Sequence, residues 1–224
     1  LLMHERGSYK DVWNQASGDH GAAMDAVAAT RNYDEFMESG KDSAKTMIDM
    51  LSIRPSDVVL EIGCGTGRIG AALAPHCARW IGTDISGQML SYAINNLKQF
   101  SNIELVELQT CGLAEFENES IDKLYCSAVF MHLDEWDRYR YVAEAFRVLK
   151  PGGIAYFDNI NLGGDIGWGI FSELAGHDPA ARPATISKTS TVEEVRIYMS
   201  RAGFTKLKEF PGSHLLAITG HKPS

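Results

Sequence analysis

Between residues 56 and 160, short apolar runs rich in β-branched residues alternate with segments that carry apolar residues at helical spacing. This alternation is typical of βαβ units, in which helices connect parallel strands and cover their sheet. We therefore predict an α/β fold built on a doubly wound, mostly parallel sheet. The strands predicted in this region are Val58 to Ile62, Arg79 to Thr83, Ile103 to Glu107, Lys123 to Ala128 and Ile154 to Asp158.

The helices between and after these strands have recognisable ends. A helix from Ser86 to Gln99 begins at a residue type that caps helices, and a helix from Asp134 to Leu149 must end before Pro151. Thr191 and Glu194 form the sequence pattern of a capping box at the start of a helix that reaches Ala202. Two closing strands are predicted after it, Phe204 to Phe210 and Leu215 to Thr219.

Two segments fall outside the alternation, and they define the predicted domain organisation. Residues 1–41 are expected to form a helical N-terminal cap, with a helix from about His20 to Met37 before another from Asp42 to Leu51. Residues 42–224 form the main domain, in which the glycine-rich segment 159–190 is too long for an ordinary connection and is predicted to be a lid-like insertion. We expect both segments to lie over the active face.

Composition excludes several classes of partner. The chain has 21 basic and 29 acidic residues and no basic run, which argues against a nucleic acid partner. Its apolar runs, such as Leu215 to Ile218, are far shorter than the roughly 20 residues that span a bilayer. The four cysteines contain no CxxC pair or zinc spacing, and no apolar leader is visible. We therefore expect a cytoplasmic protein with no metal site; the sequence specifies no oligomeric state.

The most informative motif is the glycine loop in VVLEIGCGTGR. Gly63, Gly65 and Gly67 follow a predicted buried strand, where a side chain would obstruct a tight turn and the close approach of a ligand. Asp84 ends the next predicted strand, 21 residues after Gly63. An acid at that distance binds the ribose hydroxyls in nucleotide-binding sheets. Together the loop and the acid predict an adenosine-containing ligand.

Arg68 distinguishes between the ligands that remain. A dinucleotide-binding loop has the pattern GxGxxG, but Arg68 occupies the place of its last glycine, so the spacing is GxGxG. With Glu61 just before it, this loop resembles motif I of the class I S-adenosylmethionine-dependent methyltransferases. The resemblance continues through Asp84, the segment ending at Asp122, the FRVLKPGG run and the RAGF turn, and covers roughly residues 42–160 and 191–220.

The resemblance implies a seven-stranded sheet with an antiparallel C-terminal hairpin and S-adenosylmethionine as the cofactor. It also implies a set of cofactor contacts. The methionine part would lie against Gly63, Cys64 and Gly65, with Glu61 supporting it and the Ser127 backbone near its amino group. Asp84 would bind the ribose hydroxyls. Ile85 and Met89 would flank the adenine ring, and the backbone of Cys111, Gly112 and Leu113 would contact the edge of that ring. The family commonly has an acid where this chain has Thr110.

Some of these side chains also have plain structural interpretations. The side chain of Met89 fits a helix core, and Cys64 and Cys126 fit small buried hydrophobic positions better than nucleophiles. A glycine turn after a strand is often structural, but the matching acid at Asp84 favours a ligand site.

Methyl transfer from a sulfonium is an in-line displacement, so alignment of the two reactants supplies much of the catalysis. His132, just past the fourth predicted strand, is the candidate catalytic base, although a histidine recurs here in the resembled family without a shared catalytic role. No Asn-Pro-Pro, Asp-Pro-Pro or Pro-Cys motif of nucleic acid methyltransferases is present. We therefore predict a small-molecule acceptor, with oxygen as the favoured atom and nitrogen or carbon left open.

Further side chains are candidates for enclosing the acceptor. They are Trp13, Tyr33 and Phe36, the aromatic residues of 159–190 and, with weaker cause, His177 and His214. Two other functions stay open. A nicotinamide-dependent oxidoreductase would share the fold and the ribose acid, and a non-catalytic cofactor-binding protein would explain Thr110 and the lack of an assured base.

Overall fold

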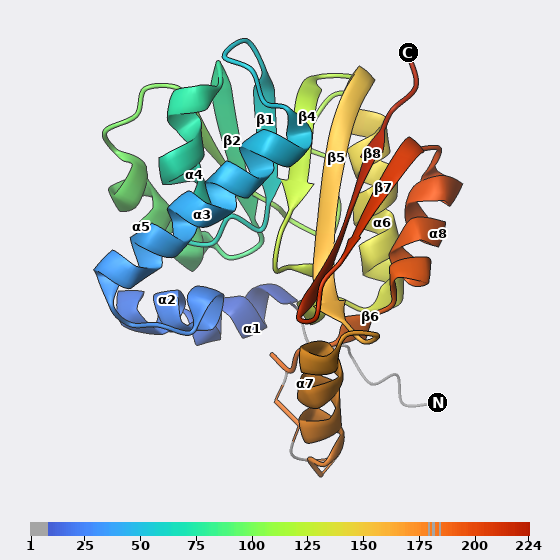
Figure 1. Cartoon of the computed structure of the whole chain (residues 1–224). Helices are drawn as coiled ribbons and strands as arrows, with labels where there is room; N and C mark the ends of the chain where they lie inside the picture. The colour runs from blue at the N-terminus through green and yellow to red at the C-terminus, as the bar shows by residue number, and fades with distance from the viewer. Residues whose placement is uncertain (1–8, 179, 181, 184) are drawn as a thin grey trace, which may run out of the picture.

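The computed structural model describes residues 9–178, 180, 182–183 and 185–224. One sheet runs through the molecule in the order β3-β2-β1-β4-β5-β8-β7, and the two-residue β6 pairs with the end of β5. Strands β1 to β5 are parallel, while β8 is antiparallel to both β5 and β7 (Figure 1). The strands are β1 Val58–Ile62, β2 Arg79–Asp84, β3 Ile103–Glu107, β4 Ile121–Cys126, β5 Leu149–Asn161, β6 Thr189–Ser190, β7 Thr205–Pro211 and β8 Leu215–His221.

The predicted α/β fold, including the antiparallel closing strands, is confirmed. Two strands differ most from the prediction. β4 begins and ends two residues earlier than predicted, and β5 extends from Leu149 to Asn161, so that Pro151 lies within a strand. The pairing of β4 with β5 has a register shift between Ile121 and Lys123, next to this proline, and the irregularity lets the strand continue.

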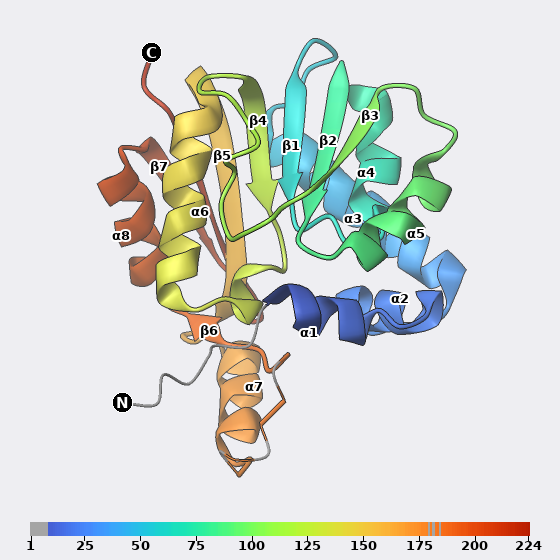
Figure 2. The same ribbon diagram turned by 180° about the vertical axis from the view of Figure 1, so that it is seen from behind.

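Helices cover both faces of the sheet. The helices are α1 Tyr9–Ala16, α2 His20–Ala28, α3 Tyr33–Leu51, α4 Arg68–Leu73, α5 Gly87–Leu97, α6 Glu135–Val148, α7 Asp165–Ala175 and α8 Val192–Ala202, with short 3-10 turns at Ala74–His76 and Phe130–His132. Helices α3, α4 and α5 pack one apolar core against the sheet, and α6 and α8 pack the other on the opposite face (Figure 2). Trp80 and Phe157 are fully buried members of these two cores.

The predicted single helix from His20 to Met37 is wrong. Helix α2 ends at Ala28, where Ala29 adopts a left-handed conformation, and α3 begins at Tyr33 and runs without interruption to Leu51. The break arises because the Asn32 side chain accepts hydrogen bonds from the backbone N–H groups of Asp34 and Glu35, which is a helix start. The hydrophobic spacing continued across this cap and concealed it.

The predicted caps are partly confirmed. The Ser86 side chain accepts a hydrogen bond from the Met89 backbone N–H at the start of α5, and Thr191 accepts one from the Glu194 N–H at the start of α8. The Glu194 side chain does not complete the capping box. It forms an ion pair with Arg138 of α6 instead, at 3.0 Å.

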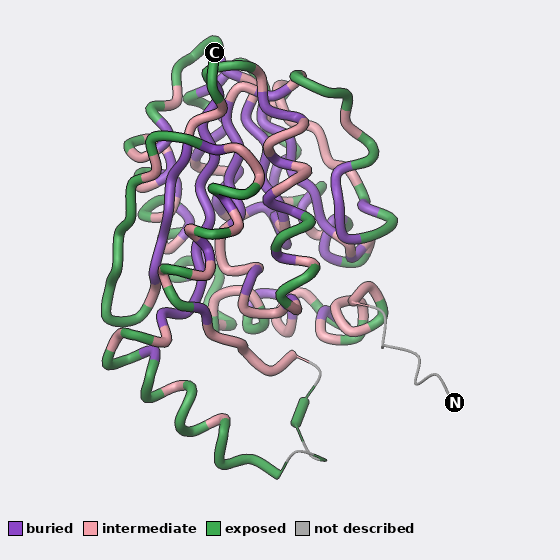
Figure 3. Tube along the Cα trace, turned by 90° about the vertical axis from the view of Figure 1, so that its right-hand side faces the viewer, coloured by how far each residue is buried: buried purple, intermediate pink, exposed green. Residues whose placement is uncertain are grey.

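Helices α1, α2 and α7 lie at the end of the sheet where the carboxyl termini of the parallel strands meet (Figures 1 and 2). Helices α1 and α2 run across this end of the sheet, whereas α7 projects away from it with much of its length exposed (Figure 3). Ile166, Trp168 and Phe171 of α7 are exposed. In the part of the chain that the structure describes, every helix is too short or too polar to cross a membrane.

Candidate active site

A cavity of about 510 Å³ opens where the carboxyl ends of β1, β2 and β4 meet the N-terminal helices. Its size falls within the range of small-molecule sites. Ligands bind at this edge in open α/β sheets because neighbouring strands end there and their loops diverge. The cavity is lined from several parts of the chain, by α1, α2, the loops after β1, β2 and β4, the end of β5, α7 and the start of β8.

The glycine loop forms the floor of this cavity. Gly63 and Gly65 have φ angles of +72° and +54°, which L-amino acids with side chains rarely adopt. A Cβ on Gly63 would also lie 2.3 Å from a methyl group of Val129, and one on Gly65 would lie 3.1 Å from Val27 of α2. Glycine is therefore required by the turn and by the two segments that pack on it.

Asp84 lies beside this loop at the end of β2. Its carboxylate accepts hydrogen bonds from the backbone N–H groups of Gly65 at 2.9 Å and Ser86 at 2.8 Å. Burial raises the pKa of Asp84 to about 6, and these backbone donors oppose the shift. Since a carboxylate has about four acceptor positions, it retains capacity for hydroxyl donors from a ligand.

Glu61 also lies in the cavity wall, but its carboxyl group has side-chain partners where Asp84 has backbone donors. Tyr125 donates a hydrogen bond of 2.5 Å to its carboxyl group, and the indole of Trp80 donates to the Tyr125 hydroxyl at 3.1 Å. Burial raises the pKa of Glu61 to about 8, with the Tyr125 hydrogen bond acting in the opposite direction. At pH 7 the free protein therefore holds Glu61 mainly protonated and Asp84 mainly ionised.

Most of the predicted cofactor contacts line the cavity. Besides Glu61, Gly63, Gly65 and Asp84, they include Cys64, Ile85, Met89, Cys111 and Ser127. Gly112 and Leu113 lie outside the lining, and the Leu113 backbone N–H donates to Glu144 of α6. In addition, the cavity contacts Leu108, which the sequence analysis did not single out. It follows Glu107, the last residue of β3, and the end of an apolar strand was the available signal.

Ser127 is held by a buried acid that sequence reasoning missed. Its hydroxyl donates to Asp158 of β5 at 2.6 Å, and the Ala128 backbone N–H donates to the same carboxylate at 2.7 Å. Burial raises the pKa of Asp158, and these donors oppose the shift. Asp158 thereby fixes the turn after β4 on which the cavity wall depends.

Residues of the N-terminal segment line one side of the cavity. Trp13 of α1 and residues 25–29 at the end of α2 are part of the lining. Ser86 donates a hydrogen bond to the Asn14 side chain at 2.7 Å, and Tyr92 of α5 donates to the Ser17 carbonyl at 3.2 Å. Helix α1 is thus hydrogen-bonded to the same turn that carries Asp84.

His132 lies in the 3-10 turn after β4 and lines the cavity. Its ring packs edge-on against Trp13, with ring centroids 4.7 Å apart. Burial lowers the pKa of His132 to about 4, although the backbone of Thr185 opposes the shift. Its Nδ1 atom is buried and makes no hydrogen bond to any described residue. The imidazole is therefore neutral at pH 7 and retains proton-accepting capacity.

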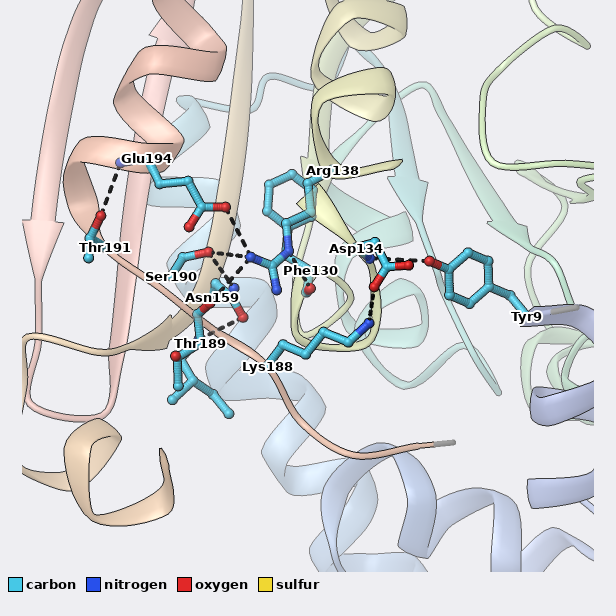
Figure 4. A network of polar contacts seen from close by, with 11 residues as sticks. Tyr9, Phe130, Asp134, Arg138, Asn159, Lys188, Thr189, Ser190, Thr191 and Glu194 are labelled. Atoms are coloured by element: carbon cyan, nitrogen blue, oxygen red, sulfur yellow. Dashed lines mark hydrogen bonds and ion pairs between the residues drawn. The ribbon is translucent and has the colours of Figure 1, made fainter. Parts of the chain in front are cut away.

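Arg138 of α6 anchors the turn that carries His132 (Figure 4). Its Nε donates to the Phe130 carbonyl at 2.9 Å, and its Nη1 donates to Ser190 at 2.8 Å and to Glu194 at 3.0 Å. Ser190 accepts a further hydrogen bond of 2.7 Å from the Asn159 side chain. The turn after β4, β6 and α8 therefore meet at one buried guanidinium.

A second set of contacts connects α1 and the segment before β6 with the start of α6 (Figure 4). Lys188 forms an ion pair with Asp134, and its backbone N–H donates to the Met131 carbonyl at 2.7 Å. The Tyr9 hydroxyl donates to Asp137 at 2.8 Å and accepts from the Asp134 backbone N–H at 3.1 Å. Three segments distant in sequence thus converge around His132.

The remaining acceptor-side predictions divide sharply. Trp13 and His214 line the cavity, whereas Tyr33 and His177 are exposed and Phe36 is fully buried in the protein. Trp168 and Phe171 of α7 also lie outside the lining. The apolar residues that form this side were not predicted, because they come from four separate parts of the chain, the turn after β4, β5, α7 and β8; they are Val129, Met131, Ile160, Ile170 and Leu215. Among the described residues, no group of three His, Cys, Asp or Glu side chains could hold a metal ion.

Comparisons with known proteins bear directly on this arrangement. Residues 59–153 match the family model described as a methyltransferase domain. The chain is 31% identical over 143 residues to malonyl-[acyl-carrier protein] O-methyltransferase of Marinomonas sp., a match that covers 60% of this chain and 50% of the relative. The chain thus spans about half the length of this curated relative.

Solved structures share the fold. An S-adenosylmethionine-dependent methyltransferase from Thermotoga maritima superposes with a TM-score of 0.65 at 20% identity, covering 85% of this chain and 94% of that one. The N-methyltransferase NodS of Bradyrhizobium japonicum, solved with S-adenosyl-L-homocysteine, gives a TM-score of 0.60 at 20% identity, covering 82% and 87% of the two chains. Together with the family match, these likenesses confirm the resemblance drawn from the glycine loop and its acid.

Proposed function

We propose that this chain is a class I S-adenosylmethionine-dependent methyltransferase that transfers a methyl group to a small-molecule acceptor, most favourably to oxygen. One observation carries the proposal: the glycine loop and the Asp84 carboxylate lie side by side in the wall of one cavity, joined by the hydrogen bond from the Gly65 N–H. That pair is what an adenosine ligand with free ribose hydroxyls requires.

The residues present fit the cofactor. Gly63 and Gly65 line the cavity, the Asp84 carboxylate has acceptor positions to spare, and Ile85 and Met89 supply apolar flanks. We assign Asp84 to the ribose, Ile85 and Met89 to the adenine, and Glu61 with the Ser127 backbone to the methionine end. When bound, S-adenosylmethionine supplies an activated methyl group on a sulfonium.

We assign the acceptor to the side of the cavity formed by Trp13, His132 and α7. The residues that meet there come from segments 1–41 and 159–190 and from the turn after β4. In this proposal, segments 1–41 and 159–190 determine which acceptor binds. Their apolar side chains favour an acceptor with a substantial apolar part. The neutral His132 accepts a hydrogen bond from an acceptor hydroxyl and takes its proton as the new oxygen–carbon bond forms.

Two measurements on the purified protein test the function, calorimetric titration with each ligand and an assay of methyl transfer to a panel of acceptors. We expect binding of S-adenosylmethionine and of S-adenosylhomocysteine, weak or absent binding of NAD, and methyl transfer to at least one member of a panel of phenols, alcohols and amines. Tight NAD binding without S-adenosylmethionine binding would replace the proposal with an oxidoreductase. Cofactor binding without transfer across the panel would favour a non-catalytic binding protein.

Substitution of His132 tests its role. We expect His132→Ala and His132→Asn to lower kcat about a hundredfold with the best acceptor of the panel, the usual scale for a lost general base, and to leave S-adenosylhomocysteine affinity within about twofold. His177→Ala, an exposed histidine on the insertion, serves as the matched control. Unchanged turnover of both His132 variants at saturating acceptor would reduce His132 to a packing role.

A further inference from the structure

We propose that Arg68 binds the carboxylate of the methionine part of the cofactor. This inference rests on the proposed function, and it assigns a role to a residue that the sequence pattern used only to exclude a dinucleotide. Arg68 is the first residue of α4, immediately after the glycine loop, and its side chain lines the cavity.

One end of the Arg68 guanidinium is fixed by the protein. Its Nη1 donates to the Ser39 carbonyl at 3.1 Å, to the Ser39 hydroxyl at 3.4 Å and to the Ser43 hydroxyl at 3.1 Å, all on α3. Gly40 lies between these serines, where a Cβ would come within 2.4 Å of the Arg68 carbonyl, so α3 and α4 are in direct backbone contact here. The guanidinium is therefore held in one orientation before a ligand arrives.

The other edge of the guanidinium is without acceptors. Nε is buried and makes no hydrogen bond to any residue that the structure describes, and no such bond from Nη2 is seen within that part of the chain either. Buried donors are almost always satisfied in folded proteins, so an unused buried N–H calls for a ligand or water. Nε and Nη2 form the side edge of the guanidinium, which is the pair that grips a carboxylate with two parallel hydrogen bonds.

Charge in the cavity points the same way. Among the described lining residues, Arg68 is the one lysine or arginine, whereas Asp25, Glu61 and Asp84 are acidic. S-adenosylmethionine presents a carboxylate together with an ammonium, a sulfonium and ribose hydroxyls. Asp84, which is mainly ionised at pH 7, complements the ribose hydroxyls, and among the described lining residues only Arg68 offers a permanent positive charge to the carboxylate.

A structural alternative is that Arg68 merely balances buried acids. Glu61 and Asp158 do favour the charged form of Arg68, but burial is the larger influence and lowers the pKa of the guanidinium. No ion pair joins Arg68 to either acid in the part of the chain that the structure describes; the hydrogen bonds of its guanidinium go to Ser39 and Ser43. The Glu61 carboxyl group is instead bonded to Tyr125, and Asp158 to Ser127, Ala128 and Tyr156. Charge balance therefore leaves the Nε edge unexplained.

The test compares two ligands that differ only in the carboxylate, S-adenosylmethionine and its decarboxylated form, in calorimetric titrations. For Arg68→Met we expect the affinity for S-adenosylmethionine to fall at least about thirtyfold, since two charge-assisted hydrogen bonds are lost, while the affinity for the decarboxylated ligand changes less than about threefold. Arg68→Lys keeps the positive charge but cannot form the two parallel hydrogen bonds of Nε and Nη2. We therefore expect a smaller loss of affinity, again confined to S-adenosylmethionine with its carboxylate.

Arg196→Met, on the exposed face of α8, is the control and should bind both ligands as the wild type does. Equal losses for the two ligands in both Arg68 variants would overturn the inference and make Arg68 a structural support. If Arg68→Met does not fold, as judged by circular dichroism, Arg68→Lys alone decides between these outcomes. Failure of the wild-type protein to bind either ligand would reject the proposed function itself.

Discussion

Replacing Asp84 with alanine should weaken binding of S-adenosylhomocysteine at least about a hundredfold. In the proposed complex two ribose hydroxyls donate to one ionised carboxylate, and hydrogen bonds to a charged acceptor are worth roughly 1.5–3 kcal/mol each. The carboxylate is already oriented by the Gly65 and Ser86 backbone N–H groups, so little ordering is needed when the ligand arrives. Isothermal titration calorimetry measures the loss directly.

The same carboxylate predicts a pH dependence with a definite sign. The ionised form binds the hydroxyls, and burial has raised the pKa of Asp84 to about 6. Affinity should therefore level off about one unit above pH 6 and fall as the pH drops below 6, approaching tenfold per unit, because binding must then expel a proton. Titrations between pH 5 and 7 stay below the pKa of Glu61, about 8, so that group remains protonated in the free protein throughout.

Asp84→Asn separates the charge from the shape of this side chain. It should bind the ligand weakly and without a pH dependence between 5 and 7. Thermal unfolding of both variants must be followed, because the Gly65 and Ser86 N–H groups lose an acceptor in Asp84→Ala. Asp49→Ala, an exposed acid near the end of α3, is the matched control. Wild-type affinity in folded Asp84→Ala would remove this residue from the ribose site.

The sequence predicted the cofactor half of the site well because its geometry is local. The glycine loop and Asp84 each occupy the end of a strand, and parallel neighbours bring such ends together automatically, as the 2.9 Å hydrogen bond from the Gly65 N–H shows. The alternation predicted the mostly parallel sheet, and the family resemblance predicted its antiparallel closing strands. Glycine positions needed for a left-handed turn are visible in any sequence.

The acceptor half was predictable only as a pair of segments. Trp13, Ile170 and Leu215 reach the cavity from α1, α7 and β8, and their docking depends on tertiary contacts that have no local spacing rule. Phe36 illustrates the difficulty, because an aromatic residue in a predicted cap is equally suited to a core and is fully buried in one. Arg68 was seen as a departure from one motif, and its orientation by α3 could not be inferred.

Glu194 shows how a tertiary demand overrides a local rule. The capping-box pattern at Thr191 would direct the glutamate back to its own helix, but the buried guanidinium of Arg138 needs a countercharge more than the exposed cap needs a second hydrogen bond. That observation assigns Arg138 a structural weight that no sequence motif indicated.

Removing this guanidinium should be the most destabilising single change on the acceptor side. In Arg138→Met the Phe130 carbonyl and the Glu194 carboxylate lose their donor, and the Arg138 side chain is only 5% exposed, so water cannot replace it freely. Breaking a buried pair by deleting one partner costs about 3–5 kcal/mol, so we expect the free energy of unfolding to fall by about 3 kcal/mol, allowing for the partial exposure of Glu194. Urea denaturation followed by circular dichroism measures it.

Two comparisons make this expectation specific. Arg196→Met breaks an ion pair with Glu193 on the surface of α8 and should not change the urea midpoint measurably, because water solvates both groups. Glu194→Gln keeps an acceptor for Arg138 and should cost less than Arg138→Met. Since Arg138 also anchors the turn that carries His132, its loss should lower kcat at temperatures where the variant is still folded. A wild-type urea midpoint for Arg138→Met would show that the turn after β4, β6 and α8 hold together by apolar packing alone, with the buried guanidinium contributing nothing net.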